Sequence, residues 1–225
     1  MRQVVISDIH GMFDIFLKTL NDVEYNEKND QLIILGDLID RGNFSYDVVD
    51  YIIQLQKRAS VIVLMGNHED MAINSVENPS NTALWYYNGG RSTVESYEIK
   101  GFTINRHIDW IRNLPLFYED DNFFFCHAGV KPEVPYNRQT RNDLLWIRGE
   151  FFDSPVKLPK EVIFGHTPFN AGHAIFKNGA IGIDAGCYHT KRMTSLVIED
   201  NGKNIQKQFS IHGKDFYRNV VENWV

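Results

Sequence analysis

The chain has 225 residues, with 23 Lys and Arg against 29 Asp and Glu, a formal net charge of −6 and 43% hydrophobic residues. This composition is typical of a globular protein, and the length predicts one domain over residues 1–225. The negative charge argues against a protein that binds nucleic acid by neutralising its phosphate backbone.

The cysteines and the hydropathy exclude further classes of protein. Cys126 and Cys187 are not in CxxC spacing, so they form neither a disulfide framework nor a thiolate zinc site, and we expect both to be small buried hydrophobic residues. A membrane-spanning helix needs ~18 apolar residues in a row, and no such run occurs. The apolar run at residues 4–6 is too short for the core of a signal peptide. These features predict a cytoplasmic protein with no membrane partner.

Strands and helices alternate at the start of the chain. Apolar runs predict strands at residues 4–6, 31–35 and 60–65, and helical spacing predicts helices at 12–23 and through 48–55. This alternation favours an α/β fold with parallel strands joined by right-handed crossovers. Each predicted strand ends in polar residues. Because ligands bind outside the carboxyl ends of strands in open α/β sheets, we expect these ends to face one site.

The regular alternation of strands and helices stops after the third predicted strand. Residues 78–114 predict an inserted helical layer, and the residues that follow are rich in strands. Predicted strands lie at 122–126, 161–164, 173–176, 180–183, 194–198 and 204–211. Asn178-Gly179 between apolar flanks indicates a hairpin, and Asp200-Asn201-Gly202 indicates another turn. We therefore expect a strand-rich, largely antiparallel second half.

Polar residues follow five predicted strands in the same way. Asp8, Asp37, Asn67, His127 and His166 each stand at or just past a strand end, with Gly or Pro nearby. Each alone has a plainer explanation, such as a helix cap or a core histidine bonded to backbone. Five repetitions favour a metal site. Oxygen and imidazole ligands suit Mn, Fe, Zn or Mg, and a shared carboxylate could bridge two ions ~3.5–4 Å apart.

The ordered motifs resemble a known family. They read Asp8-Ile-His10-Gly, Gly-Asp37-x-x-Asp40-Arg41-Gly, Gly-Asn67-His68-Glu, His127-Ala-Gly and Gly-His166-Thr-Pro. In order and spacing they are similar to those of the phosphoprotein phosphatase family of dinuclear, calcineurin-like metallophosphoesterases, in its small bacterial and phage branch. The resemblance implies mixed β-sheets in a central sandwich flanked by helices.

The resemblance also implies a role for each motif residue. Asp8, His10 and Asp37 would hold one divalent ion, and Asp37 would bridge to a second ion held with Asn67, His127 and His166. Mn²⁺ is the first expectation for both ions, with Fe, Zn or Mg as alternatives. His68 would be the general acid rather than a ligand.

Three further residues complete the expected site. Asp40 would orient His68 and hold it as an imidazolium, and Arg41 would bind the phosphate. Arg148 would be the second phosphate clamp, with Arg141 as its rival; the plainer alternative for either is a surface salt bridge.

The implied reaction is hydrolysis of a phosphomonoester by direct attack of a metal-bridging hydroxide. A serine/threonine protein phosphatase, which could also act on phosphotyrosine, is the first reading. A symmetrical dinucleoside tetraphosphate hydrolase is the alternative, and a non-catalytic scaffold is a minor third reading because it predicts eroded ligands. The expected partner is a phosphoprotein or a phosphorylated small molecule, with no nucleic acid; the oligomeric state stays open.

Overall fold

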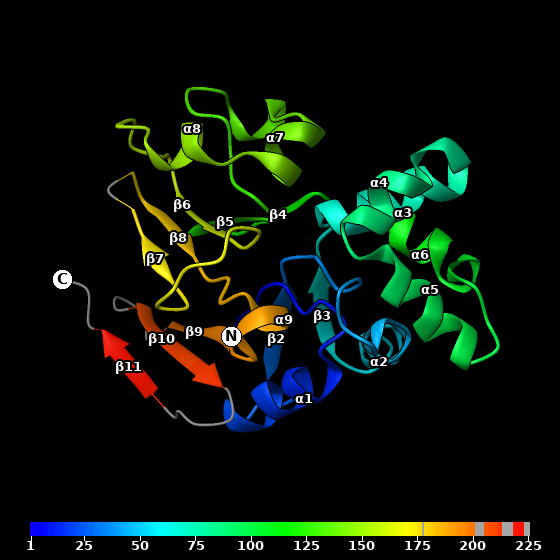
Figure 1. Cartoon of the computed structure of the whole chain (residues 1–225). Coiled ribbons are helices and arrows are strands. Elements are labelled where there is room, and N and C mark those ends of the chain that lie inside the picture. Colours follow the sequence, from blue (N-terminus) through cyan, green and yellow to red (C-terminus); the bar gives the residue numbers. More distant parts are fainter. Residues whose placement is uncertain (177, 201–204, 213–217, 223–225) are drawn as a thin grey trace.

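Two β-sheets face each other at the centre of the protein (Figure 1). The computed structural model describes residues 1–176, 178–200, 205–212 and 218–222. In spatial order the first sheet contains β11 (Arg218–Glu222), β10 (Ile205–His212), β9 (Met193–Asp200), β1 (Arg2–Ile6), β2 (Asp30–Ile34) and β3 (Ser60–Val63). The second contains β4 (Phe117–Glu119), β5 (Phe123–Cys126), β6 (Glu161–Phe164), β8 (Ala180–Gly182) and β7 (Ala174–Ile175).

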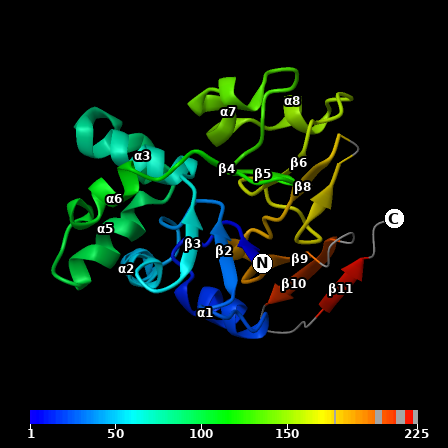
Figure 2. The same ribbon diagram turned by 180° about the vertical axis from the view of Figure 1, so that it is seen from behind.

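Helices cover the outer faces of both sheets and one edge of the first (Figures 1 and 2). They are α1 (Phe13–Asp22), α2 (Ser45–Gln56), α3 (Asn67–Glu77), α4 (Thr82–Tyr87), α5 (Gly90–Ile99), α6 (Ile108–Arg112), α7 (Arg141–Trp146), α8 (Gly149–Phe152) and α9 (Cys187–Thr190). Short 3₁₀ turns lie at Pro79–Asn81, Ile104–Arg106 and Tyr136–Arg138. None of the helices in the described ranges is long and apolar enough to cross a membrane.

The core is layered because each sheet buries both faces. Apolar side chains of the two sheets meet in one buried cluster: Val5, Ile33, Leu35, Leu64, Phe123, Phe125, Ile163, Ile181, Ile183, Leu196 and Ile198. On its other face the first sheet packs against α1, α2 and the inserted helices, and the second sheet packs against α7 and α8. Every residue of β2 is buried, as expected for a strand covered on both sides. The predicted sandwich flanked by helices is confirmed.

The parallel half of the fold matches the prediction. β1 pairs in parallel with β2, and β2 pairs in parallel with β3. The carboxyl ends of these strands therefore lie at one edge, where the polar motifs follow them. Residues 78–114 form the inserted helical layer as expected, with Trp85 and Ile111 buried in it.

The second half differs from the prediction at the centre of its sheet. β5 pairs with β6 and β6 pairs with β8 in parallel, whereas β4, β7, β9, β10 and β11 are antiparallel to their neighbours. The long segment between β5 and β6, which carries α7 and α8, allows the crossover that a parallel pair needs. β4 and β11 were not predicted. The Asn178-Gly179 hairpin joins β7 to β8 as expected, and residues 201 and 202 of the other turn lie outside the described residues.

Candidate active site

The predicted site residues converge at the carboxyl ends of strands from both sheets. Asp8 follows β1, Asp37 follows β2, and Asn67 begins α3 just after β3; His127 follows β5 and His166 follows β6. None of these five side chains is more than 6% exposed. The ends of β1, β2 and β3 therefore lie at one edge, and the residues after β5 and β6 reach the same place; that these groups act as one site stays a prediction.

The loops that carry these residues have an unusual backbone. His10, Asp37, Asp40, Arg41 and His166 have φ angles between +48° and +72°, in the left-handed region that residues other than glycine seldom adopt. Such conformations persist only where the surroundings impose them, and they cluster at functional sites. The loops are therefore held in shape by their packing.

Glu69 fixes the loop that presents Asp37. Its buried carboxylate accepts hydrogen bonds from the backbone N–H groups of Gly66 at 2.9 Å, Asp37 at 2.8 Å and Leu38 at 2.8 Å. Burial raises the pKa of Glu69 to about 7 even though these hydrogen bonds lower it. No role for Glu69 was predicted from the sequence, although Glu at the third position of a helix is a known capping signal.

One ligand group contains Asp37, His127 and His166, whose donor atoms lie within 4.8 Å of one another. His127 donates from Nδ1 to the Leu35 carbonyl at 2.8 Å, which leaves a lone pair on Nε2. That atom lies 2.9 Å from Asn67 Oδ1 and 3.4 Å from Asp37 Oδ1. His166 Nδ1 also lies 2.9 Å from Asn67 Oδ1. Burial lowers the pKa of both histidines and keeps them neutral.

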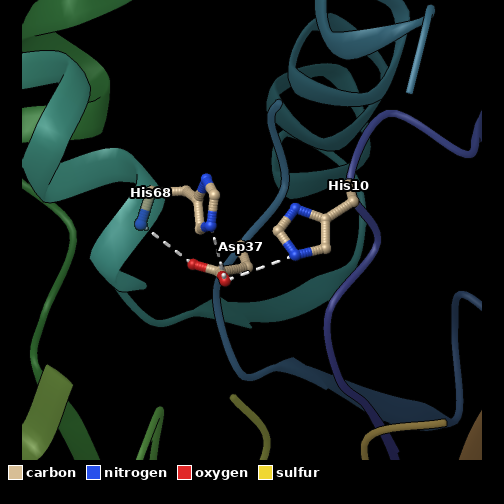
Figure 3. Close-up of side chains that lie close together, drawn as sticks. All are labelled: His10, Asp37 and His68. Carbon is tan, nitrogen blue, oxygen red and sulfur yellow. Dashed lines mark hydrogen bonds and ion pairs between the residues drawn. The ribbon is translucent and has the colours of Figure 1, made fainter. Parts of the chain in front are cut away.

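A second group contains His10, Asp37 and His68 (Figure 3). His10 donates from Nδ1 to the Ile39 carbonyl at 2.9 Å, so the lone pair of Nε2 faces Asp37 Oδ2 at 3.5 Å. His68 Nε2 lies 3.9 Å from the same oxygen. His68 Nε2 and Asp37 Oδ2 thus lie close enough to bind the same ion. The role of His68 as an acid and not a ligand stays a prediction.

Asp8 lies at the edge of this second group. Its Oδ2 is 4.0 Å from His10 Nε2, and its Oδ1 accepts from Ser7 Oγ at 2.5 Å and from the His166 N–H at 3.0 Å. Burial acts to raise the pKa of Asp8, but His127, His10 and these hydrogen bonds together lower it. Asp184 is also buried, and burial and the charge of Asp8 raise its pKa.

His68 and Asp40 form a buried pair. His68 Nδ1 lies 2.7 Å from Asp40 Oδ2, and Asp40 also accepts from Trp85 Nε1 at 2.9 Å and from Thr93 Oγ1 at 2.6 Å. Trp85 and Thr93 belong to the inserted helical layer, and the sequence analysis assigned neither to the site. Burial raises the pKa of Asp40 to about 7, against the hydrogen bonds from Thr93 and Trp85.

Arg41 lies across both histidines of the second group. Its guanidinium is 2.8 Å from His10 Nε2 and 3.0 Å from His68 Nε2. Burial, followed by the charge of Arg41, lowers the pKa of His68 well below its ordinary value. Both effects favour the neutral imidazole, and the prediction that Asp40 holds His68 as an imidazolium stays a prediction.

The two candidate clamps beyond Arg41 lie in different places. Arg148 is exposed and contacts the loop of His166, with 3.1 Å to Thr167 Oγ1 and 3.5 Å to the His166 carbonyl. Arg141 instead forms an ion pair with Asp70 at 2.6 Å. Cys126 and Cys187 are buried free thiols near the site, as expected.

The donor set fits divalent cations. Lone pairs from Asp37, Asn67 and His127 converge, although groups of this kind repel one another without a positive charge between them. Within the described ranges, the buried Nε2 of His166 has no hydrogen-bond partner. Asp37 belongs to both ligand groups, as a bridging carboxylate would.

Comparisons with known proteins agree with this geometry. The protein is 32% identical over 133 residues to the symmetrical bis(5′-nucleosyl)-tetraphosphatase of Vibrio cholerae, an alignment that covers 59% of this chain and 46% of the relative. The chain therefore matches less than half the length of that relative. It is 30% identical over 175 residues to serine/threonine-protein phosphatase 1 of Salmonella typhimurium, covering 73% of this chain and 77% of the relative.

A solved structure and a family model cover more of the chain. The crystal structure of a putative diadenosine tetraphosphatase superposes with a TM-score of 0.68 at 21% identity, covering 99% of this chain and 94% of that one, which shows a common fold. The model of the calcineurin-like phosphoesterases matches residues 1–205. The chain therefore belongs to the calcineurin-like metallophosphoesterase family.

Proposed function

We propose that the protein hydrolyses phosphomonoesters of serine and threonine in proteins, using two divalent metal ions. The observation that carries the proposal is the convergence of two ligand groups on Asp37, with the buried pair of His68 and Asp40 at their edge. This arrangement provides separate groups for binding phosphate and for moving a proton.

Six side chains would hold the ions. Asp8, His10 and Asp37 would bind one, and Asp37, Asn67, His127 and His166 the other, with Mn²⁺ as the expected metal. Two bound divalent ions supply Lewis acidity toward the phosphoryl oxygens and activate the attacking water. The backbone carbonyls of Ile39 and Leu35 orient His10 and His127, which keeps their lone pairs directed into the site.

Arg41 and Arg148 would bind the phosphoryl oxygens. Arg41 already contacts two histidines of the second group, and Arg148 contacts the loop of His166, a member of the first group. Because Arg141 is occupied by Asp70, the contacts support Arg148 as the second clamp. Two guanidinium groups placed in this way would neutralise charge on the phosphoryl group in the transition state.

His68 would protonate the leaving oxygen. Burial, followed by the charge of Arg41, lowers the pKa of His68, and the negative charge of a bound phosphate counters the effect of Arg41. Substrate binding therefore favours the imidazolium, while Asp40 holds the ring through Nδ1 and leaves Nε2 facing the site. Proton donation of this kind typically contributes ~10²–10⁴ in rate.

A dinucleoside tetraphosphate is the second candidate substrate. The relative from Vibrio cholerae supports it, and so does a cavity of about 410 Å³ beside Arg41 that a single phosphorylated side chain would leave unfilled. The phosphatase from Salmonella typhimurium supports the first candidate because it aligns over more of both chains.

A rate comparison tests the proposal and separates the candidates. The protein is freed of metal, checked by elemental analysis, reloaded with Mn²⁺, and assayed on p-nitrophenyl phosphate, a phosphoserine peptide, diadenosine tetraphosphate and a cyclic nucleotide. We expect hydrolysis to stop without metal, to return with Mn²⁺, and to be fastest on the peptide. Full activity without metal would refute the mechanism, and faster hydrolysis of the tetraphosphate would establish the second candidate.

A further inference from the structure

A cavity of about 410 Å³ lies beside the site on the side of His68 and Arg41. Its walls include Arg41, Tyr87 at the end of α4, Gly89, Arg91 in the first turn of α5, and Tyr188 in α9. The volume is within the ~300–1,000 Å³ typical of ligand sites. The cavity is therefore large enough to hold a part of the substrate beyond the scissile phosphate.

One wall of the cavity packs directly against Arg41, the proposed phosphate clamp. The Arg41 N–H donates to the Gly89 carbonyl at 3.2 Å, and a Cβ at Gly89 would lie 2.9 Å from Arg41 Cγ. Arg41 in turn contacts His68 Nε2 at 3.0 Å. In the proposed function the leaving group departs toward His68, and the cavity adjoins His68 through Arg41. The inference that follows therefore rests on the proposed function.

Arg91 brings a second positive charge to this cavity. Its guanidinium carbon lies 5.0 Å from the centre of the Tyr86 ring, and no carboxylate in the described part of the chain forms an ion pair with it. By contrast, Arg2, Arg58, Arg112 and Arg141 each pair with an acid. The described walls hold two arginines and no acidic residue, so they favour an anion.

Two tyrosines add apolar surface to the same cavity. Tyr87 is 89% exposed and Tyr188 is 40% exposed. Rings of this kind pack against planar or apolar groups and keep a polar end for hydrogen bonding. A substrate portion lying between Arg41 and Arg91 would cover them.

We propose that this cavity is a leaving-group subsite in which Arg91 binds a second anionic group that the substrate carries beyond the scissile phosphorus. Tyr87 and Tyr188 cover the portion between the two charges. The second anion is the next phosphate of a nucleoside polyphosphate or the carboxylate of an acidic residue beside a phosphoserine. A phosphomonoester with one anionic group leaves the subsite empty.

Kinetics on matched substrates test the subsite with the full-length, Mn²⁺-loaded enzyme. Arg91→Gln removes the charge, and Arg106→Gln is the control because Arg106 also lies over a ring, 4.7 Å from the centre of Phe102, but is not a wall of the cavity. The substrates are p-nitrophenyl phosphate, diadenosine tetraphosphate, and phosphoserine peptides flanked by Asp or by Asn. A binding measurement compares tripolyphosphate with orthophosphate by calorimetry.

We expect Arg91→Gln to lower kcat/KM for the tetraphosphate or for the Asp peptide, relative to p-nitrophenyl phosphate, by about tenfold, which is typical of one charge-assisted contact. The substrate affected identifies the source of the anion. Tripolyphosphate binding should weaken more than orthophosphate binding, and Arg106→Gln should keep the wild-type ratios.

Unchanged ratios in Arg91→Gln together with unchanged tripolyphosphate affinity would overturn the subsite, as would an equal fall in Arg106→Gln. The binding measurement does not depend on turnover. Two results together would refute the proposed function and leave the subsite supported. The wild-type protein would hydrolyse none of these substrates, and Arg91→Gln would bind tripolyphosphate more weakly than the wild type does.

Discussion

The strand-end edge and the inserted helical layer contribute to the site in different ways. The edge supplies the six side chains expected to hold metal, and each lies a few residues beyond a strand. The inserted layer, residues 78–114, supplies groups that hold edge residues in place: Trp85 and Thr93 bind Asp40, and Gly89 packs against Arg41. The edge therefore determines which reaction is available, and the layer determines how its groups are oriented.

Asp37→Asn should have the largest effect because Asp37 belongs to both ligand groups. We expect it to lose more bound metal than Asp8→Asn, which removes a carboxylate at the edge of one group only. Elemental analysis of both variants after identical loading with Mn²⁺ measures this difference. Equal metal content in the two variants would contradict a bridging role for Asp37.

His68→Asn should have the second largest effect. It tests whether, at the strand-end edge, proton transfer and metal binding are carried out by different residues. We expect two metal ions per chain to be retained while kcat on a poor leaving group falls by ~10²–10⁴. The fall should be smaller for p-nitrophenyl phosphate, because nitrophenolate needs less protonation. A lost metal ion would show that His68 is a ligand, and an equal fall for both leaving groups would show that His68 does not protonate the leaving oxygen.

Thr93→Val tests the inserted layer directly. Thr93 donates to Asp40 Oδ1 at 2.6 Å and accepts from the Asp40 N–H at 2.8 Å, so valine removes both bonds with little change in shape. We expect stability to fall by about 1–3 kcal/mol, and activity on the poor leaving group to fall by roughly tenfold. Urea unfolding and paired assays measure the two effects.

The combination with His68→Asn distinguishes positioning from general destabilisation. If Thr93 acts through Asp40 and His68, the double variant should lose little more activity than His68→Asn alone. Activity losses that simply add would show that Thr93 affects the fold and not the orientation of the acid.

Gly89→Ala should have the smallest effect. Gly89 has φ +105°, and its added Cβ would lie 2.9 Å from Arg41 Cγ; Gly101, with φ +79°, has nothing within 4 Å of an added Cβ. Both variants should lose about 1–2 kcal/mol of stability from the left-handed backbone. Only Gly89→Ala should also raise KM for p-nitrophenyl phosphate severalfold, and the same rise in Gly101→Ala would exclude displacement of Arg41 as its cause.

The residues at the strand-end edge could be predicted from the sequence because the patterns that mark them are local. An apolar run that ends in Asp, Asn or His marks both the strand and the polar group that follows, and parallel pairing brings such ends together. β5, β6 and β8 were predicted as strands, but their parallel pairing depends on how the segment carrying α7 and α8 crosses the sheet. The sequences of the strands themselves contain no pattern that predicts this crossover.

The contributions of the inserted layer could not be found in the same way. Trp85 and Asp40 are 45 residues apart, and Thr93 and Asp40 are 53 apart. A tryptophan and a threonine on short helices are ordinary packing residues until the fold brings them to a buried carboxylate. The lowered pKa of His68 could not be predicted from the sequence for a related reason, since it depends on burial and on the approach of Arg41.

Hydrogen bonds at the site also join the two sheets. His127, which follows β5, donates to the carbonyl of Leu35 after β2, and the N–H of His166, which follows β6, donates to Asp8 after β1. A shift of one sheet against the other by a single residue, ~3.3 Å, would break both bonds. The residues of the site therefore oppose sliding of one sheet over the other, because such a movement breaks bonds that these residues make.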